Sequence, residues 1–130
     1  MRPKVLLVED DEIIREIYTL KFALEGYPVA AAENGEVGLR MITEFEPEIV
    51  LLDMMMPVMG GLDFMKRLKA SGKKMPEIIV FSNISAPKQV DAVMRLGAKA
   101  YWTKSDYTPD RCVVALAEFW QSGAGGIAAV

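Results

Sequence analysis

The sequence has 130 residues and 52% of them are hydrophobic, which is enough for one core and predicts a single domain. The formal net charge is −3 and the Lys and Arg residues are scattered rather than gathered in a block, so the composition argues against nucleic-acid binding. There is no histidine and only one cysteine, which excludes a Ser-His-Asp triad, a Cys-His pair, histidine-ligated zinc and an internal disulfide.

The single cysteine, Cys112, lies in an apolar run, and we interpret it as a small core residue. An unpaired cysteine fits a reducing compartment. The four apolar residues after Lys4 are too few for a signal peptide, and no run approaches the length of a membrane span. The expectation is a soluble cytoplasmic protein without a membrane partner.

Strand-like and helix-like segments alternate along the chain. Short apolar runs predict strands at 5–8, 29–32, 49–52, 78–81 and 101–103. Apolar residues at helical spacing predict helices at 13–24, 37–45, 62–68, 90–94 and 108–120. Five strand-then-helix units predict an α/β fold with a doubly wound, five-stranded parallel sheet and helices on both faces. We assign residues 1–122 to this domain and the Gly/Ala-rich residues 123–130 to a C-terminal tail.

The first predicted helix carries more apolar residues than one core-facing stripe needs. One stripe consists of Ile13, Ile17, Leu20 and Leu24, and the other of Ile14, Tyr18 and Phe22. Either the helix is wedged between neighbours, or part of it offers apolar surface to a partner. The pattern leaves open which residues do so.

Polar residues follow the carboxyl ends of four predicted strands: Glu9 and Asp10, Asp53, Ser82, and Lys104. In a doubly wound sheet these ends meet in one crevice, where ligands bind. Three carboxylates that lie close together repel, so either one of them becomes protonated or a cation neutralises them. Oxygen ligands favour a hard cation such as Mg²⁺. A hydroxyl and an ammonium group supply donors for a phosphoryl group. The constellation therefore predicts a phosphoryl site with Asp53 at its centre.

Simpler interpretations exist for some of these acids. Asp53 alone is compatible with a residue that caps the following loop. Asp11 and Glu12 are explained by the preference for acids at a helix N-terminus. Neither interpretation explains why Asp53 and Lys104 coincide with the acidic pair.

Over residues 4 to 121 the chain resembles the receiver domain of bacterial two-component response regulators. The resemblance rests on short motifs that occur in the right order and on the right elements. They are Leu-Leu-Val-Glu9-Asp10, Leu52-Asp53-Met-Met-Met-Pro57, Val80-Phe-Ser82, Gly97-Ala98, Tyr101 and Lys104. The resemblance implies a flavodoxin-like sheet with strand order 2-1-3-4-5, and a signalling domain rather than an enzyme that turns over a separate substrate.

The resemblance implies transfer of a phosphoryl group to Asp53 from a phosphohistidine, on either a sensor histidine kinase or a histidine phosphotransfer domain. It also implies that Mg²⁺ is required. Asp10, Asp53 and the backbone carbonyl of Met55 would hold the ion, with Glu9 acting directly or through water.

The remaining site residues take their roles from the same resemblance. Lys104 would pair with Asp53 and then with its phosphoryl group, while Ser82 would bind one phosphoryl oxygen. Ser82 and Tyr101 would form the switch, with Tyr101 moving inward on phosphorylation. The altered surface of the fourth helix, fifth strand and fifth helix would then bind an effector protein or a second copy of the chain.

The sequence departs from the family pattern at two places. Ser105 follows Lys104 where the family usually has a proline after a cis bond; because a cis bond before a residue other than proline costs about 2.5 to 4 kcal/mol, we expect a trans bond. Gly60-Gly61 stands where Asp-Gly is usual, and we expect a looser loop there. In addition, Met55 and Ile84 flank the path of an attacking water and cannot hydrogen-bond it usefully, which predicts slow autodephosphorylation.

Rival classes fit less well. A phosphatase of the haloacid dehalogenase type wants a second Asp two residues after the first, where this chain has Met55. A flavodoxin-like electron carrier needs a hydroxyl- and Gly-rich loop after the first strand, where this chain has acids. The strongest alternative is a phosphorylation-independent interaction module of the same shape, because a fold alone does not fix a function.

Overall fold

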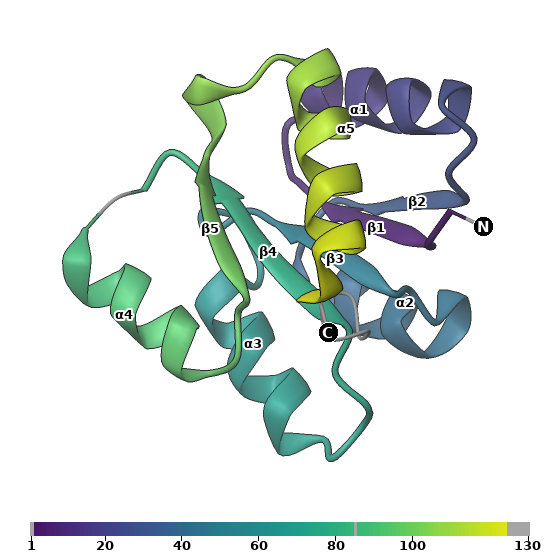
Figure 1. Cartoon of the computed structure of the whole chain (residues 1–130). Helices are drawn as coiled ribbons and strands as arrows, with labels where there is room; N and C mark the ends of the chain where they lie inside the picture. Colours follow the sequence, from purple (N-terminus) through teal and green to yellow (C-terminus); the bar gives the residue numbers. More distant parts are fainter. Residues whose placement is uncertain (1, 85, 125–130) are drawn as a thin grey trace.

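The computed structural model describes residues 2–84 and 86–124. It contains one parallel sheet in which the strand order is β2-β1-β3-β4-β5, as the resemblance implied (Figure 1). The strands are β1 (Val5–Val8), β2 (Val29–Ala32), β3 (Ile49–Leu52), β4 (Glu77–Ser82) and β5 (Ala100–Thr103). The predicted flavodoxin-like α/β fold is therefore confirmed.

Helices cover both faces of the sheet. They are α1 (Glu12–Leu24), α2 (Gly35–Phe45), α3 (Gly61–Ala70), α4 (Pro87–Arg95) and α5 (Pro109–Phe119). In Figure 1, α1 and α5 lie above the sheet, and α2, α3 and α4 lie on its other side. Two short turns were not predicted: a 3₁₀ turn at Lys104–Asp106 and a π-helical turn at Trp120–Ala124. The π-helical turn includes the first two residues of the predicted tail, and residues 125–130 lie outside the described residues.

Side-chain caps fix where three helices begin. The carboxylate of Asp11 accepts a hydrogen bond from the backbone N–H of Ile14 at 3.0 Å, and the Asn34 side chain caps α2 in the same way. Thr108 caps α5, with Pro109 at its first position. Each cap satisfies an N–H group that has no partner within the helix. The use of Asp11 as a cap agrees with its simpler interpretation from the sequence.

Alternate residues of the buried strands supply two cores, one on each face of the sheet. Leu6, Val8, Val50 and Leu52 belong to the core beneath α2, α3 and α4. The residues between them, including Leu7 and Leu51, belong to the core beneath α1 and α5, which also contains the fully buried Cys112. Such two-sided burial leaves little freedom in the position of each strand end.

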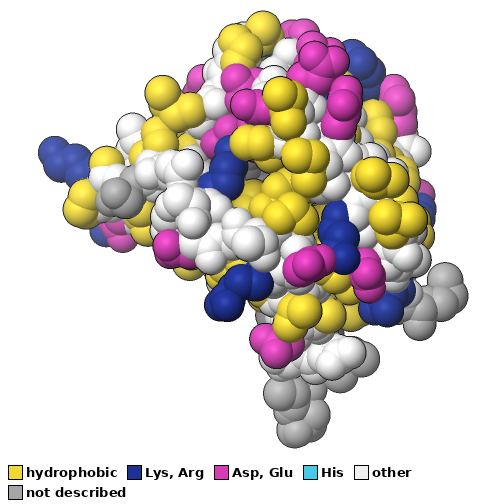
Figure 2. Space-filling view, turned by 90° about the horizontal axis from the view of Figure 1, so that it is seen from above, with side chains coloured by type: hydrophobic (Ala, Val, Ile, Leu, Met, Phe, Trp, Pro, Cys, Tyr) yellow, Lys and Arg dark blue, Asp and Glu magenta, His cyan; other side chains and the backbone are white. Residues whose placement is uncertain are grey.

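Helix α1 uses only one of its two apolar stripes for this packing. Tyr18 and Phe22 are buried, whereas the exposed fractions of the other stripe are 68% for Ile13, 46% for Ile17, 61% for Leu20 and 73% for Leu24. The helix is thus not wedged between neighbours. Figure 2 views the molecule from above, over α1 and α5, and shows hydrophobic side chains exposed among charged ones. Among the described residues, no helix is long and apolar enough to cross a membrane.

Candidate functional site

The ends of β1 and β3 place two acids side by side. Val8 pairs with Leu52 in the sheet, so the residues that follow them, Glu9 and Asp53, leave the sheet together. Backbone hydrogen bonds continue one step past the strands, because the N–H of Asp53 donates to the carbonyl of Val8 at 3.0 Å. Glu9 is only 1% exposed and Asp53 6% exposed. The sheet therefore holds both carboxylates where they are almost completely shielded from solvent.

Asp10 completes a cluster of three carboxylates. One oxygen from each of Glu9, Asp10 and Asp53 lies within 4.8 Å of the others. Asp10 is exposed, which leaves the cluster open to solvent on one side. A hard divalent cation with several retained waters suits such a set of oxygen ligands. The residues present thus fit a Mg²⁺ site, in agreement with the expectation from the sequence.

Arg15 is a residue of this site that sequence reasoning missed. Its guanidinium donates to the backbone carbonyls of Glu9 at 2.8 Å and Asp10 at 3.2 Å. The carboxylate of Glu9 is oriented separately, since it accepts from the N–H of Asp11 at 3.0 Å. Arg15 therefore fixes the backbone that carries the acidic pair. The sequence signal for this role was the position of Arg15, about one turn into a predicted helix that follows the two acids.

Lys104 brings a positive charge from the end of β5 to the acids. Its Nζ lies 2.6 Å from Oε1 of Glu9 and 3.3 Å from Oδ2 of Asp53. Burial raises the pKa of Glu9, and the hydrogen bond from Lys104 opposes that rise. Burial by itself lowers the pKa of Lys104, but the hydrogen bond to Glu9 and the charge of Asp53 outweigh it and raise that pKa. The expected pairing of Lys104 with Asp53 is present, and Glu9 holds the closer contact.

Ser82 ends β4 at the same edge and is only 1% exposed. Its Oγ accepts from the N–H of Ile84 at 3.4 Å, while the N–H of Met55 lies 3.4 Å from Oδ1 of Asp53. Both loops thus turn a backbone N–H toward the centre of the site. The Ser82 hydroxyl proton is free to be donated to a ligand.

Tyr101, the predicted switch aromatic, is a half-buried residue of β5. Its hydroxyl is already buried, and no donor or acceptor among the described residues makes a hydrogen bond of ordinary geometry with it. Burial raises the pKa of Tyr101, the nearby Ser82 hydroxyl lowers it, and the charge of Asp53 raises it further. The inward movement on phosphorylation stays a prediction, since the hydroxyl is buried here while the residue as a whole is half-buried.

The two departures from the family pattern have different outcomes. The Lys104–Ser105 bond is trans, as predicted, and the N–H of Ser105 donates to Oδ1 of Asn83 at 2.8 Å. The loop at Gly60-Gly61 is not loose. A Cβ on Gly61 would lie 2.6 Å from the carbonyl oxygen of Asp53, and one on Gly60 2.9 Å from that of Met54. These glycines allow α3 to begin directly against the Asp53 backbone.

The family model "Response regulator receiver domain" matches residues 5–116. The uncharacterized transcriptional regulatory protein YkoG of Bacillus subtilis (strain 168) is 36% identical over 100 residues, which are 77% of this chain and 43% of that protein. The response regulator MprA of Mycolicibacterium vanbaalenii is 32% identical over 104 residues, which are 80% of this chain and 45% of that protein. The chain thus spans less than half the length of these curated relatives.

Solved structures agree with the family match. The N-terminal domain of an uncharacterized protein from Wolinella succinogenes superposes with a TM-score of 0.81 and 33% sequence identity, covering 92% of this chain and 94% of that one. The chemotaxis protein CheY4 of Vibrio cholerae superposes with a TM-score of 0.80 and 25% identity, covering 91% of this chain and 98% of that one. Both likenesses extend over nearly the whole domain.

Proposed function

Because the chain belongs to the family of response regulator receiver domains, which function in two-component signal transduction, we propose that Asp53 is its phosphoacceptor. The observation that carries this proposal is the position of Asp53. It is a buried carboxylate at a strand end, within a cluster of acids and 3.3 Å from an ammonium group. The donor is a phosphohistidine on a sensor histidine kinase or a histidine phosphotransfer domain.

In the transfer step, a carboxylate oxygen of Asp53 forms a bond to phosphorus as the P–N bond of phosphohistidine breaks. The electron pair of that bond stays with the imidazole, which takes a proton and leaves neutral. The protein contributes mainly position and charge, because phosphoryl transfer has little covalent chemistry for it to perform. Catalysis is confined to the domain's own phosphorylation and its slow reversal.

Mg²⁺ would be held by Asp10, Asp53 and the backbone carbonyl of Met55, with Glu9 acting directly or through water. When bound, the ion neutralises negative charge that the phosphoryl group brings to the carboxylates. The fit rests on the donor set, since three carboxylates face one ammonium group and two negative charges remain uncompensated.

Three donors surround the position of the phosphoryl oxygens. Lys104 turns from Asp53 toward one oxygen while it keeps Glu9 as its second partner. The Ser82 hydroxyl donates to another, and the N–H of Met55 already faces Asp53. Such charge-assisted hydrogen bonds are about twice as strong as neutral ones. They stabilise the phosphorylated state relative to the free state, which a switch requires.

The output of the switch is a changed surface over α4, β5 and α5. Ser82 ends β4, and Tyr101 lies on the neighbouring strand β5, where it pairs with Val80, two residues before Ser82. A shift of Ser82 toward the phosphoryl group changes the packing around the buried Tyr101 hydroxyl. The surface then binds an effector protein, or a second copy of the chain, in the cytoplasm. A module that acts without phosphorylation has no need for the complete set of acids, hydroxyl and lysine.

The decisive experiment is intact-protein mass spectrometry after treatment with acetyl phosphate and Mg²⁺. We expect one phosphoryl group on the native chain, and none on Asp53→Asn or when Mg²⁺ is chelated. Asp63→Asn, which alters an exposed acid of α3, is the matched control and should be labelled normally. Labelling that persisted in Asp53→Asn would contradict the proposal.

A further inference from the structure

A second cavity lies at the edge of the sheet opposite Asp53. Its volume is about 560 Å³, within the range of about 300 to 1,000 Å³ that small-molecule pockets occupy. Glu48 and Glu77 line it at the starts of β3 and β4, and Trp120 lines it at the end of α5. Because β3 separates Glu48 from Asp53 by five steps of about 3.3 Å each, this cavity lies on the order of 16 Å from Asp53. It is therefore a separate site.

Three acids line the cavity, Glu46, Glu48 and Glu77, and none of them forms an ion pair among the described residues. Oε1 of Glu77 is buried and has no hydrogen-bond partner among the described residues. Oε1 of Glu48 accepts from the backbone N–H of Lys4 at 3.0 Å, which orients the carboxylate without neutralising it. Within the part of the chain that the structure describes, neither carboxylate has a Lys or Arg nitrogen within 4.0 Å. Because Oε1 of Glu77 is buried without a partner, its carboxylate favours an added cation, and the exposed Glu48 adds a second negative charge.

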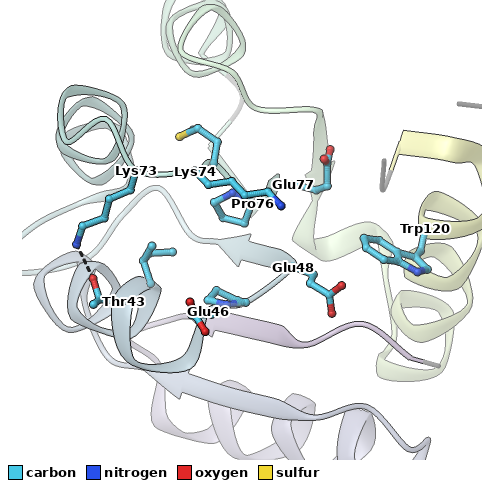
Figure 3. A pocket seen from close by; sticks show the side chains of 11 residues that line it. Thr43, Glu46, Glu48, Lys73, Lys74, Pro76, Glu77 and Trp120 are labelled. Carbon is cyan, nitrogen blue, oxygen red and sulfur yellow. Dashed lines mark hydrogen bonds between the residues drawn. The ribbon is translucent and has the colours of Figure 1, made fainter. Parts of the chain in front are cut away.

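Trp120 stands at one side of the hollow, and Figure 3 shows Glu77 and Glu48 on either side of the space before it. Two other aromatic rings near this edge each form a cation–π contact with a basic side chain. The guanidinium of Arg2 lies 4.9 Å from the centre of the Tyr27 ring, and Nζ of Lys4 lies 5.5 Å from that of Phe45. No described cation lies over the indole of Trp120. The indole thus offers an unused face beside two uncompensated acids.

The lysines of the cavity do not supply the missing charge. Lys73 donates to the hydroxyl of Thr43 at the opposite side of the hollow (Figure 3). Lys74 is exposed and forms no ion pair among the described residues. Figure 3 shows the Lys74 side chain extending into the hollow, but its nitrogen lies more than 4.0 Å from the carboxylate oxygens of Glu48 and Glu77. These carboxylates therefore leave room for a cation from a bound molecule.

We propose that this cavity binds a guanidinium group carried on an aliphatic chain. A planar guanidinium stacks on an indole, pairs with carboxylates through its fork of N–H donors, and is more weakly hydrated than an ammonium group. The aliphatic chain would contact Ile42 and Met75, which also line the cavity. The group comes either from a free compound or from an arginine side chain of a partner polypeptide.

Three probes test whether binding depends on positive charge or on shape alone. They also test whether the ligand is a free compound or an arginine side chain. N-acetylarginine amide represents an arginine within a polypeptide, agmatine represents a free compound, and N-acetylcitrulline amide is the neutral counterpart of the first. Binding is followed by NMR through the indole N–H of Trp120. The indole of Trp102, which stacks on Tyr107, is the internal reference. We expect dissociation constants on the order of a millimolar for such small ligands.

The charged probes should shift the Trp120 signal and leave Trp102 in place. The tighter of the two charged probes identifies the source. No binding by either one, or equal binding by the citrulline compound, would overturn the proposal, because the cavity would then not recognise the guanidinium charge.

Variants test the assigned residues. Glu77→Gln and Glu48→Gln should each weaken binding roughly tenfold, since each removes a charge-assisted pair. Glu44→Gln, an exposed acid of α2 that does not line the cavity, is the matched control and should bind normally. Lys74→Gln should bind at least as tightly, because it removes a like charge. Amide spectra establish that each variant is folded. Glu48→Gln should disturb the fold less than Glu77→Gln, because Glu48 is exposed. Weaker binding by Lys74→Gln, or unchanged binding by both glutamate variants, would refute the assignment.

Discussion

The ammonium group of Lys104 and the carboxylate of Glu9 form a buried ion pair of 2.6 Å, although 95 positions separate the two residues. The same ammonium group reaches Asp53 at 3.3 Å. One positive charge is thus shared between two buried acids. If Asp53 is phosphorylated as proposed, we expect Lys104 to keep its contact with Glu9 while it turns toward the phosphoryl group.

Replacing Lys104 by Met should separate metal binding from phosphorylation. Mg²⁺ should bind several-fold more tightly because a competing positive charge is gone, while phosphorylation should slow by about a hundredfold because a phosphoryl donor is lost. Without Mg²⁺ the free energy of unfolding should fall by about 3 to 5 kcal/mol, as is typical when one partner of a buried pair is removed.

A calorimetric Mg²⁺ titration, intact-mass kinetics and denaturant unfolding measure these three effects. Lys99→Met alters an exposed lysine and should change none of them. Weaker Mg²⁺ binding by Lys104→Met would show that Lys104 organises the acids rather than competing with the ion.

Phosphorylated Asp53 should decay slowly. Met55 and Ile84 carry the two N–H groups that face the site, and their apolar side chains cannot orient an attacking water. Met55→Asn and Ile84→Glu should each shorten the lifetime by one to two powers of ten, at about 1.4 kcal/mol for each tenfold change. The lifetime is read by mass spectrometry after the donor is removed. Polar variants that decayed no faster would leave water exclusion by this pair without support.

The switch should depend on the Ser82 hydroxyl. Phosphorylation of the native chain should shift amide signals over residues 85 to 115, and Ser82→Ala should still be phosphorylated but show much smaller shifts. The reason is that the new hydrogen bond from Ser82 supplies the difference between the two states. Because the Tyr101 hydroxyl is already buried, its hydrogen bonding should change on phosphorylation. Identical spectra of the free and phosphorylated native chain would refute the switch.

The sequence predicted the sheet edge well because strand ends obey a simple rule. Runs such as residues 49–52 are buried on both faces, so the first polar residue after them marks the carboxyl end. That rule found Glu9, Asp53, Ser82 and Lys104. It could not find that Lys104 lies nearer to Glu9 than to Asp53, because this preference depends on how far β5 carries the side chain across the site.

Close packing at Gly61 should make it intolerant of any side chain. Gly61→Ala would place a methyl group 2.6 Å from the carbonyl oxygen of Asp53, so either α3 or the Asp53 backbone must shift. We expect a loss of about 1 to 3 kcal/mol in the free energy of unfolding, together with slower phosphorylation. Gly72→Asn is the control, because its Cβ meets open space and Asn tolerates the positive φ of 73°. If Gly61→Ala unfolded and reacted like the native chain, the close approach would be unimportant.

Cys112 should give the unfolding free energy a dependence on alkaline pH. Burial raises the pKa of its thiol to about 12 from 9.0. Because the folded-state pKa is raised, the contribution to stability is full below about pH 9 and is lost as pH rises toward about 12. Relative to Cys112→Ala, the native chain should lose roughly 1 kcal/mol between about pH 8 and about pH 10.

Denaturant unfolding of both chains at the two pH values tests this effect. Tyr18, whose pKa burial also raises to about 12, is present in both chains and largely cancels. Parallel pH dependences of the two chains would mean that the thiol ionises as easily in the folded state as in the unfolded one.

The sequence could not decide which side of α1 packs inward. Both stripes are apolar and lie at helical spacing, so hydrophobicity alone does not rank them. Tyr18 and Phe22 face the core because their rings contact other aromatic rings there. Tyr18 packs edge-on against Phe81 of β4, and Phe22 packs edge-on against Tyr27. The cavity beside Trp120 was not predicted for a related reason, since its residues come from three separate segments that only the fold brings together.

The strand order also governs how this chain emerges during synthesis. Strands β2, β1 and β3 can pair as soon as residue 52 is available, but the free edge of β3 waits until β4 ends at residue 82. At about 5 to 20 residues per second, that edge stays unpaired for roughly two to six seconds. During this interval Ile49, Val50, Leu51 and Leu52, all 0% exposed in the finished protein, form an open apolar edge on the ribosome. We therefore expect chaperone binding to the nascent chain to be greatest between the synthesis of β3 and that of β4, before the end of β5 brings Lys104 to Asp53.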